Sequence, residues 1–242
     1  MINQSNFVIE FNEEQIAIKE TLKDFANKKI KPHILEWDEK QYFPIGVIKE
    51  LGELGFLGIL VDEKYGGSNY GYVEYALIVE ELAKIDPSIA LSVAAHNGLC
   101  TNHIYLFGNE LQKQKYLTDL ATGKKIGAWG LTEPNSGSDA IAMNTTAELI
   151  NDKFILNGTK QFITHGASAE VYVIMAITDK AKGKNGVSAF ILEKGMKGFS
   201  VGKKENKLGM RASETTQLIF ENCEVPTENL LGNLGEGFVP AM

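Results

Sequence analysis

The apolar residues of this 242-residue chain change their spacing once, near Ile126. Before that point they recur every three or four positions, as on the buried face of amphipathic helices. After it, short β-branched or apolar runs alternate with Gly, Asn and Asp, which is typical of short strands joined by turns. One switch of this kind predicts a helical half followed by a β half, which is the α+β class.

The first half predicts a helical bundle. Asn12 is a good N-cap for the first helix, and Pro32 ends or bends that helix. Pro44 suits the first position of the second helix. The remaining helices are expected at about Val73 to Lys84, Ser88 to Cys100 after Pro87, and Glu110 to Ala121. The segment after Pro87 is apolar on nearly all sides, so we expect it to be buried between other helices.

The second half predicts an antiparallel barrel or sandwich. Asn151-Asp152 reads as the two-residue turn of a hairpin. Asn157-Gly158 reads as a second turn. Strands are expected at Thr145–Ile150, Lys153–Leu156, Val171–Ile177, Val187–Leu192 and Thr216–Phe220.

This pattern suggests three parts: an N-terminal helical domain of residues 1–125, a middle β domain of residues 126–234, and a short start of something further at residues 235–242. The Gly-rich stretch from Leu230 is followed by an apolar run that begins at Phe238. A domain rarely ends where such a run restarts. We therefore expect the sequence to be truncated.

Composition excludes several classes of function. The net charge of −7 and the short lysine clusters argue against a nucleic-acid-binding face. No apolar run approaches the roughly 20 residues of a membrane span. Met1 to Glu10 lacks the features of a signal or transit peptide. These observations favour a bacterial cytoplasmic protein, although a processed protein of the mitochondrial matrix would look the same.

Cysteine and histidine usage gives no metal or disulfide signature. Cys100 and Cys223 are far apart, so we expect two buried free thiols. Metal-ligand spacing is absent around all four histidines, His33, His96, His103 and His165. An ordinary loop position is the favoured interpretation of His165.

The segment from Trp129 to Asp139, W-G-L-T-E-P-N-S-G-S-D, offers hydroxyl donors and a glycine that lets a ligand approach the backbone. Successive backbone N–H groups in such a turn suit a pyrophosphate. Taken alone, the segment is better interpreted as an ordinary surface turn, because such turns are common.

Two later segments have the same ambiguity. In Asn157 to Gly166, alternation along a strand would place Phe162 and Thr164 on one face, where they can meet a flat heteroaromatic ring. A core phenylalanine beside a satisfied threonine is the simpler alternative. Arg211 could clamp a phosphate, but an ion pair at a domain junction is favoured.

In this order and spacing, the segments resemble the acyl-CoA dehydrogenase family, and the resemblance covers essentially the whole chain. Glu80 to Ser88 and Phe107 to Leu117 of the helical half also match it. The sequence is most similar to short- and medium-chain members such as the butyryl-CoA dehydrogenases. Acyl chain length itself cannot be read from the sequence.

The resemblance implies FAD as cofactor and assigns roles by position. Cofactor-binding positions are Trp129, Leu131, Thr132, Gly137, Ser138, Phe162, Ile163 and Thr164. Ser138 would also lie near the CoA chain, and many relatives carry Trp where this chain has Phe162. Leu91, Ala95 and Leu99 are candidates for the wall of the acyl tail, although a stripe of this kind is usually core.

The implied reaction oxidises a fatty acyl-CoA to the trans-2-enoyl-CoA and passes electrons to an electron-transferring flavoprotein. In the family the base is a Glu of the C-terminal helical domain, so no catalytic residue is assigned here, and Glu133 is expected to be structural. A homotetramer is implied for the full-length protein. The alternatives are an acyl-CoA oxidase, a flavin monooxygenase of the same superfamily, or a non-catalytic fragment or binding module.

Overall fold

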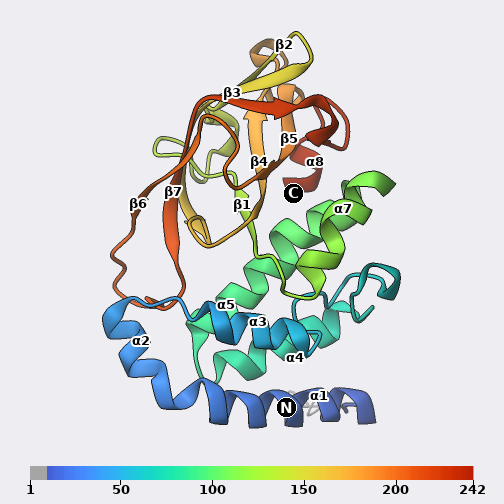
Figure 1. The fold of residues 1–242 in the computed structure, drawn as a ribbon, viewed down its shortest axis with the longest axis vertical. Coiled ribbons are helices and arrows are strands. Elements are labelled where there is room, and N and C mark those ends of the chain that lie inside the picture. Colours follow the sequence, from blue (N-terminus) through green and yellow to red (C-terminus); the bar gives the residue numbers. More distant parts are fainter. Residues whose placement is uncertain (1–9, 242) are drawn as a thin grey trace, which may run out of the picture.

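The computed structural model describes residues 10–241, which form a helical region followed by a β-sheet region (Figure 1). The α+β prediction is confirmed. The expectation that residues 1–10 form no targeting peptide concerns residues that, apart from Glu10, lie outside the described range. Met242 also lies outside it.

The helices begin and end close to the predicted positions. They are α1 (Glu13–Lys29), α2 (Ile34–Lys40), α3 (Ile45–Glu53), α4 (Tyr72–Ala83), α5 (Pro87–Ala95), α6 (Asn102–Phe107), α7 (Glu110–Ala121) and α8 (Phe238–Ala241). Asn12 caps α1 by accepting a hydrogen bond from the Gln15 backbone N–H at 2.8 Å. Pro32 lies in the short 3₁₀ turn between α1 and α2. Pro44 stands one position earlier than predicted, at the N-cap of α3.

The predicted helix after Pro87 is longer and less buried than expected. It continues through a π-helical segment, His96–Thr101, directly into α6. Leu91 and Leu99 are each 37% exposed. One side of α5 packs against α4, and the π-helical segment lies against strand β1. The helix therefore keeps an apolar stripe uncovered at the junction between the helices and the sheet.

The sheet is mixed but mostly antiparallel. Its strands are β1 (Gly127–Gly130), β2 (Thr146–Ile150), β3 (Lys153–Thr164), β4 (Val171–Ile177), β5 (Val187–Glu193), β6 (Phe199–Lys204), β7 (Thr215–Pro226) and β8 (Leu230–Leu231). They follow the order β6-β7-β3-β2-β4-β5-β8, and β1 pairs with β4. The β1–β4 pair and a single β2–β4 pairing are parallel, which the purely antiparallel expectation did not include.

The second predicted turn, at Asn157-Gly158, is wrong. Strand β3 runs through these residues, and the β3–β7 register shifts between Leu156 and Gly158. The Asn157 side chain accepts a hydrogen bond from the Asn222 N–H of β7 at 2.8 Å. Gly158 has φ +148°, and a Cβ there would lie 2.7 Å from the Thr145 Cα. The Asn-Gly pair thus forms a bulge that lets two strands approach closely.

We expect Gly158→Ala to lower the free energy of unfolding by about 3 kcal/mol, because strained backbone and backbone overlap add. Gly195→Ala is the control, since Gly195 also has positive φ (+88°) but nothing lies within 4 Å of its Cβ position. That variant should lose about 1 kcal/mol, the cost of the left-handed backbone alone. Urea denaturation of both proteins measures the difference. Equal losses would show that contact with Thr145 does not matter.

The helical and β regions are joined by polar contacts. The Arg211 backbone N–H donates to Asp38 Oδ1 at 3.2 Å, and its Nε donates to the Asp38 carbonyl at 3.0 Å. This confirms the structural interpretation of Arg211. Gln112 of α7 donates to the carbonyls of Glu228 and Leu230, both at 2.8 Å. These contacts fix α2 and α7 against the β region.

Both cysteines are free and buried, as predicted. Burial raises the pKa of the Cys100 thiol to about 12 and that of Cys223 to about 11. Among residues 10–241, no helix has the length and hydropathy needed to cross a bilayer.

Candidate functional site

A hollow of about 160 Å³ lies where α5, the π-helical segment, β1 and β3 meet. Its lining combines apolar, aromatic and hydroxyl side chains. They are Ala95, Leu99, Ala128, Trp129, Leu131, Thr132, Phe162, Ile163 and Thr164. Three segments far apart in sequence therefore converge on one place. Six of the eight residues predicted for cofactor binding, and two of the three predicted for the acyl wall, lie here.

Phe162 has the least ordinary conformation in this hollow. Its φ is +59°, a left-handed conformation that bulky aromatic residues rarely adopt. Its side chain is 61% exposed. The β3–β7 register shifts between Lys160 and Ile163. Because of this bulge, alternation fails and Phe162, Ile163 and Thr164 all line the hollow, whereas the strand pattern predicted only the first and last on one face. Strained backbone holding an exposed aromatic ring is a common feature of binding sites.

The exit of β1 forms the opposite wall. The Gln161 backbone N–H of β3 donates to the Thr132 carbonyl at 2.8 Å, which holds the two walls together. Trp129 Nε1 is buried and has no hydrogen-bond partner among the described residues. A buried donor without a partner is unfavourable, so it favours a ligand with an acceptor at this wall.

A buried ion pair lies behind this wall. Lys160 Nζ lies 2.7 Å from Glu133 Oε1, and the side chains are 0% and 4% exposed. Glu133 also accepts from the backbone N–H groups of Asn144 and Thr145, at 2.5 and 3.0 Å. Burial alone would raise the pKa of Glu133, but Lys160 and these donors hold it below its usual value. The expectation that Glu133 is structural agrees with this geometry.

Two buried histidines hold Gly127 at the start of β1. The Gly127 N–H donates to His96 Nδ1 at 3.0 Å, and the Gly127 carbonyl lies 3.1 Å from His165 Nδ1. His165 lies in the turn after β3, so its predicted loop position is confirmed, but it is fully buried and packs against Phe43, unlike an ordinary loop histidine. Burial lowers the pKa of His96 to about 3 and that of His165 to about 4, so both are neutral at pH 7.

The remaining predicted site residues lie elsewhere. Ser138 borders a second hollow of about 670 Å³, together with Ile141, Lys184 and Phe238. Gly137 is exposed, and a Cβ there would meet nothing within 4 Å. Leu91 lies on α5 one turn before Ala95 and does not line the first hollow.

Comparison with protein families identifies the family of this chain. Residues 12–124 match the acyl-CoA dehydrogenase N-terminal domain, and residues 128–223 match the acyl-CoA dehydrogenase middle domain. The chain belongs to the acyl-CoA dehydrogenase family.

Individual acyl-CoA dehydrogenase relatives agree with this assignment. The chain is 48% identical to the short-chain-specific acyl-CoA dehydrogenase of Clostridium acetobutylicum over 95% of its own length and 60% of the relative's. It matches a chain in a structure described as the electron transferring flavoprotein of Acidaminococcus fermentans, with TM-score 0.94 and 50% identity, covering 97% of this chain and 62% of that one. An acyl-CoA dehydrogenase from Bacillus anthracis solved with FAD matches with TM-score 0.89 and 43% identity, covering 96% and 40%. The chain thus spans about 60% of the length of the curated relative.

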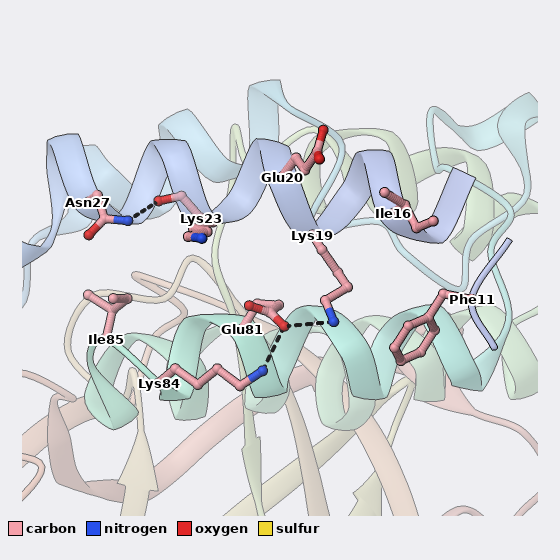
Figure 2. Close-up of a pocket in the computed structure, with 9 residues that line it drawn as sticks. All are labelled: Phe11, Ile16, Lys19, Glu20, Lys23, Asn27, Glu81, Lys84 and Ile85. Carbon is pink, nitrogen blue, oxygen red and sulfur yellow. Dashed lines mark hydrogen bonds and ion pairs between the residues drawn. The ribbon is translucent and has the colours of Figure 1, made fainter. Parts of the chain in front are cut away.

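A third hollow, about 610 Å³, is a groove between α1 and α4 (Figure 2). Glu81 lies at its centre and pairs with Lys84 at 2.7 Å and with Lys19 at 3.5 Å. Figure 1 shows α1 at the end of the molecule opposite the sheet. Among residues 10–241, no three His, Cys, Asp or Glu side chains gather as metal ligands would.

Sequence reasoning did not single out three buried residues at this hollow, of which Ala128 lines it and the other two lie behind its lining. His96, Lys160 and Ala128 carried no motif of their own, and each is buried. A lysine with no exposed surface is rare, but the sequence gives no indication of its burial. Their role becomes visible only when β1, β3 and the π-helical segment are brought together.

Proposed function

We propose that this chain forms the flavin-facing part of an acyl-CoA dehydrogenase, which oxidises a fatty acyl-CoA thioester to the trans-2-enoyl-CoA with FAD as cofactor. The observation that supports it best is the convergence of Trp129, Thr132, Phe162 and Thr164 on one hollow. Family membership and the FAD bound by the Bacillus anthracis relative support the same assignment.

The residues present fit part of such a cofactor. A flat ring system needs an aromatic face, and the exposed Phe162 offers one. Thr132 and Thr164 offer hydroxyl groups in the same hollow, and Trp129 offers a buried donor without a partner. Phe162 has no N–H, so any polar contact at its position would come from a neighbour. When bound, FAD would supply the acceptor for the hydride.

We propose that Gly137 and Ser138 serve the pyrophosphate and CoA side of the ligand. Ser138 borders the larger hollow, where Lys184 supplies a cation for anionic groups. Ala95 and Leu99 would contact the acyl tail near the ring, and Leu91 would extend that wall along α5. The short-chain-specific relative supports an acyl-CoA substrate.

Removal of the α-proton requires a base, and we propose that the base comes from outside this lining. None of the nine described residues around the hollow carries a carboxylate. Glu133, the nearest in sequence, is committed to Lys160 and to two backbone donors. We therefore assign no catalytic residue within residues 10–241. A non-catalytic role of this chain by itself is the second candidate, favoured by the same observation.

The same proposal extends to partners, location and organisation. The Acidaminococcus match supports an electron-transferring flavoprotein as electron acceptor. Bacterial relatives support a cytoplasmic location. A homotetramer is proposed from the family resemblance, as is a division into residues 1–125, 126–234 and a further helical domain from residue 235.

The cofactor assignment predicts a large loss of flavin binding in Phe162→Ala. Stacking on an aromatic side chain is worth about 1–3 kcal/mol per ring, so we expect FAD affinity to fall about 5- to 150-fold. The matched control is Tyr72→Ala, since Tyr72 is 66% exposed on α4 and does not line the hollow. Flavin fluorescence titration, followed by an absorption spectrum after desalting, measures both. Equal affinity in the two variants would refute the ring-facing role of Phe162.

A wild-type chain that holds no flavin at all would count against the cofactor role of these residues in this chain. Oxygen reactivity separates the remaining enzyme alternatives. A dehydrogenase passes electrons to the flavoprotein acceptor and reacts slowly with oxygen, whereas an acyl-CoA oxidase or a flavin monooxygenase of the same superfamily consumes oxygen rapidly.

A further inference from the structure

We propose that Lys160 and Glu133 form a positioning pair that sets the Thr132 wall of the hollow against the Phe162–Thr164 wall before any ligand binds. The inference rests on the proposed flavin site, because it assigns the pair a role in shaping that site. Neither residue lines the hollow, so neither is placed in contact with the cofactor.

Lys160 connects the two walls directly. It lies on β3, two residues before Phe162. Its Nζ donates to the Leu131 carbonyl at 3.0 Å and to Glu133 Oε1 at 2.7 Å. The adjacent Gln161 N–H donates to the Thr132 carbonyl. Leu131 and Thr132 of the wall and the adjacent Glu133 are therefore bonded to two consecutive residues of β3.

Glu133 extends this connection toward the second hollow. Its carboxylate accepts from the Asn144 and Thr145 N–H groups, which end the loop that follows Ser138. Its backbone exchanges hydrogen bonds with Ser136, at 2.8 and 3.2 Å. Ser136 Oγ in turn donates to the Asp139 carbonyl at 2.7 Å. Glu133 thus bonds the loop after Ser138 through its carboxylate and the turn before Ser138 through its backbone.

Gly130 leaves space for the Lys160 side chain. A Cβ at Gly130 would lie 3.2 Å from the Lys160 Cγ and 2.7 Å from the Ile174 Cδ1. A glycine in β1 therefore lets the lysine stem pass behind the strand.

A positioning role explains why ionic groups occupy this place. Removing both charges from water is costly, and well-packed apolar side chains often stabilise a protein equally well. An apolar pair has no directional bonds to the Leu131 carbonyl or the Thr145 N–H. The ionic pair fixes backbone groups in one arrangement, and a preformed site loses less freedom on binding.

The test separates positioning from stability with a double variant. Lys160→Met alone leaves Glu133 buried without its cation and should destabilise the fold. In Lys160→Met with Glu133→Gln, the charge is gone and the amide oxygen still accepts from the Thr145 N–H, so melting should recover in part. The amide NH2 cannot accept from the Asn144 N–H, so that one hydrogen bond is lost. The matched control is Lys153→Met with Glu224→Gln. It removes an exposed 2.7 Å pair that also joins β3 to a facing strand.

Two readouts apply to the chain at pH 7. Amide hydrogen exchange is measured without flavin at Glu133, Ser136, Thr145 and Gln161. Asn144 is left out because Glu133→Gln removes its acceptor directly. FAD affinity is measured by fluorescence titration. In the double variant we expect these amides to exchange at least 10-fold faster than in the wild type, and FAD to bind at least 10-fold more weakly. The control should change neither.

The possible outcomes separate a positioning role of the pair from a purely structural one. If the double variant regains stability together with wild-type exchange and FAD affinity, the pair is structural only and the inference fails. Loss of global stability without faster exchange at these amides also overturns it. If the wild-type chain binds no FAD, the flavin proposal fails for this chain, while faster local exchange in the double variant would still support the pair as the element that sets the two walls.

Discussion

Lowering the pH from 7 to 5 should reduce the free energy of unfolding of this chain by about 4 kcal/mol, through His96 and His165. Both side chains are fully buried, and burial lowers their pKa values to about 3 and about 4. Histidine in an unfolded chain titrates near 6.5. Between these values the unfolded chain binds protons that the folded chain excludes, so stability falls as the pH falls.

The hydrogen bonds of His96 show why protonation is opposed. Its Nδ1 accepts from the Gly127 N–H, and its Nε2 lies 3.0 Å from the Leu120 carbonyl. An amide can only donate and a carbonyl can only accept, which fixes the neutral form with hydrogen on Nε2. A proton on Nδ1 would face the Gly127 N–H and break that bond. The neighbouring His165, when charged, would add repulsion.

The magnitude follows from the pH window. One pKa unit corresponds to about 1.4 kcal/mol, and each histidine loses about 1.5 units of advantage between pH 6.5 and 5. Two histidines together therefore give about 4 kcal/mol. Stability should be nearly constant above pH 7. Carboxylate titration adds to the loss below pH 5, so the measurement belongs above that value.

Urea denaturation at half-unit steps from pH 7.5 to 5 tests this expectation. His165→Gln removes one of the two titrating groups, while the glutamine amide can still donate to the Gly127 carbonyl. The pH dependence of the free energy of unfolding should therefore fall to about half in this variant. His33→Gln is the control, since the His33 side chain is about half exposed. A wild-type chain equally stable at pH 7 and 5 would contradict the assigned burial of both rings.

Local signals explain which parts of the fold could be predicted from sequence. Asn12 and Asn109 each begin a helix with a capping box, and Gly123 follows the end of α7 with φ +72°. The hairpin at Asn151 has the positive φ that its turn requires. Each of these features depends on residues within a few positions of one another, so the sequence pattern is sufficient.

Features set by distant partners could not be predicted in this way. Strand β6 is largely exposed and polar, and β8 is only two residues long, so neither shows strand periodicity. The bulge at Phe162 exists because Gln161 bonds to Thr132 instead of continuing the β3–β7 ladder. Family resemblance named the lining of the hollow, but the positive φ of Phe162 and the burial of Lys160 depend on the whole sheet.

Lys160→Met should lower the free energy of unfolding by about 3–5 kcal/mol, the range measured when one partner of a buried ion pair is removed. Glu133 would then be a buried carboxylate without its cation, held only by the Asn144 and Thr145 donors. The mutation should also raise the pKa of Glu133, because burial raises it and the opposing charge of Lys160 is gone.

Lys153→Met, on the same strand, is the matched control. Lys153 pairs with Glu224 at the same 2.7 Å, but its side chain is 54% exposed and Glu224 keeps Lys197 at 2.6 Å. Exposed pairs contribute about 0–1 kcal/mol, so this variant should unfold almost as the wild type does. Chemical denaturation at pH 7 gives both values. Losses of similar size would mean that burial gives the Lys160–Glu133 pair no larger effect on stability than an exposed pair has, and the prediction would fail.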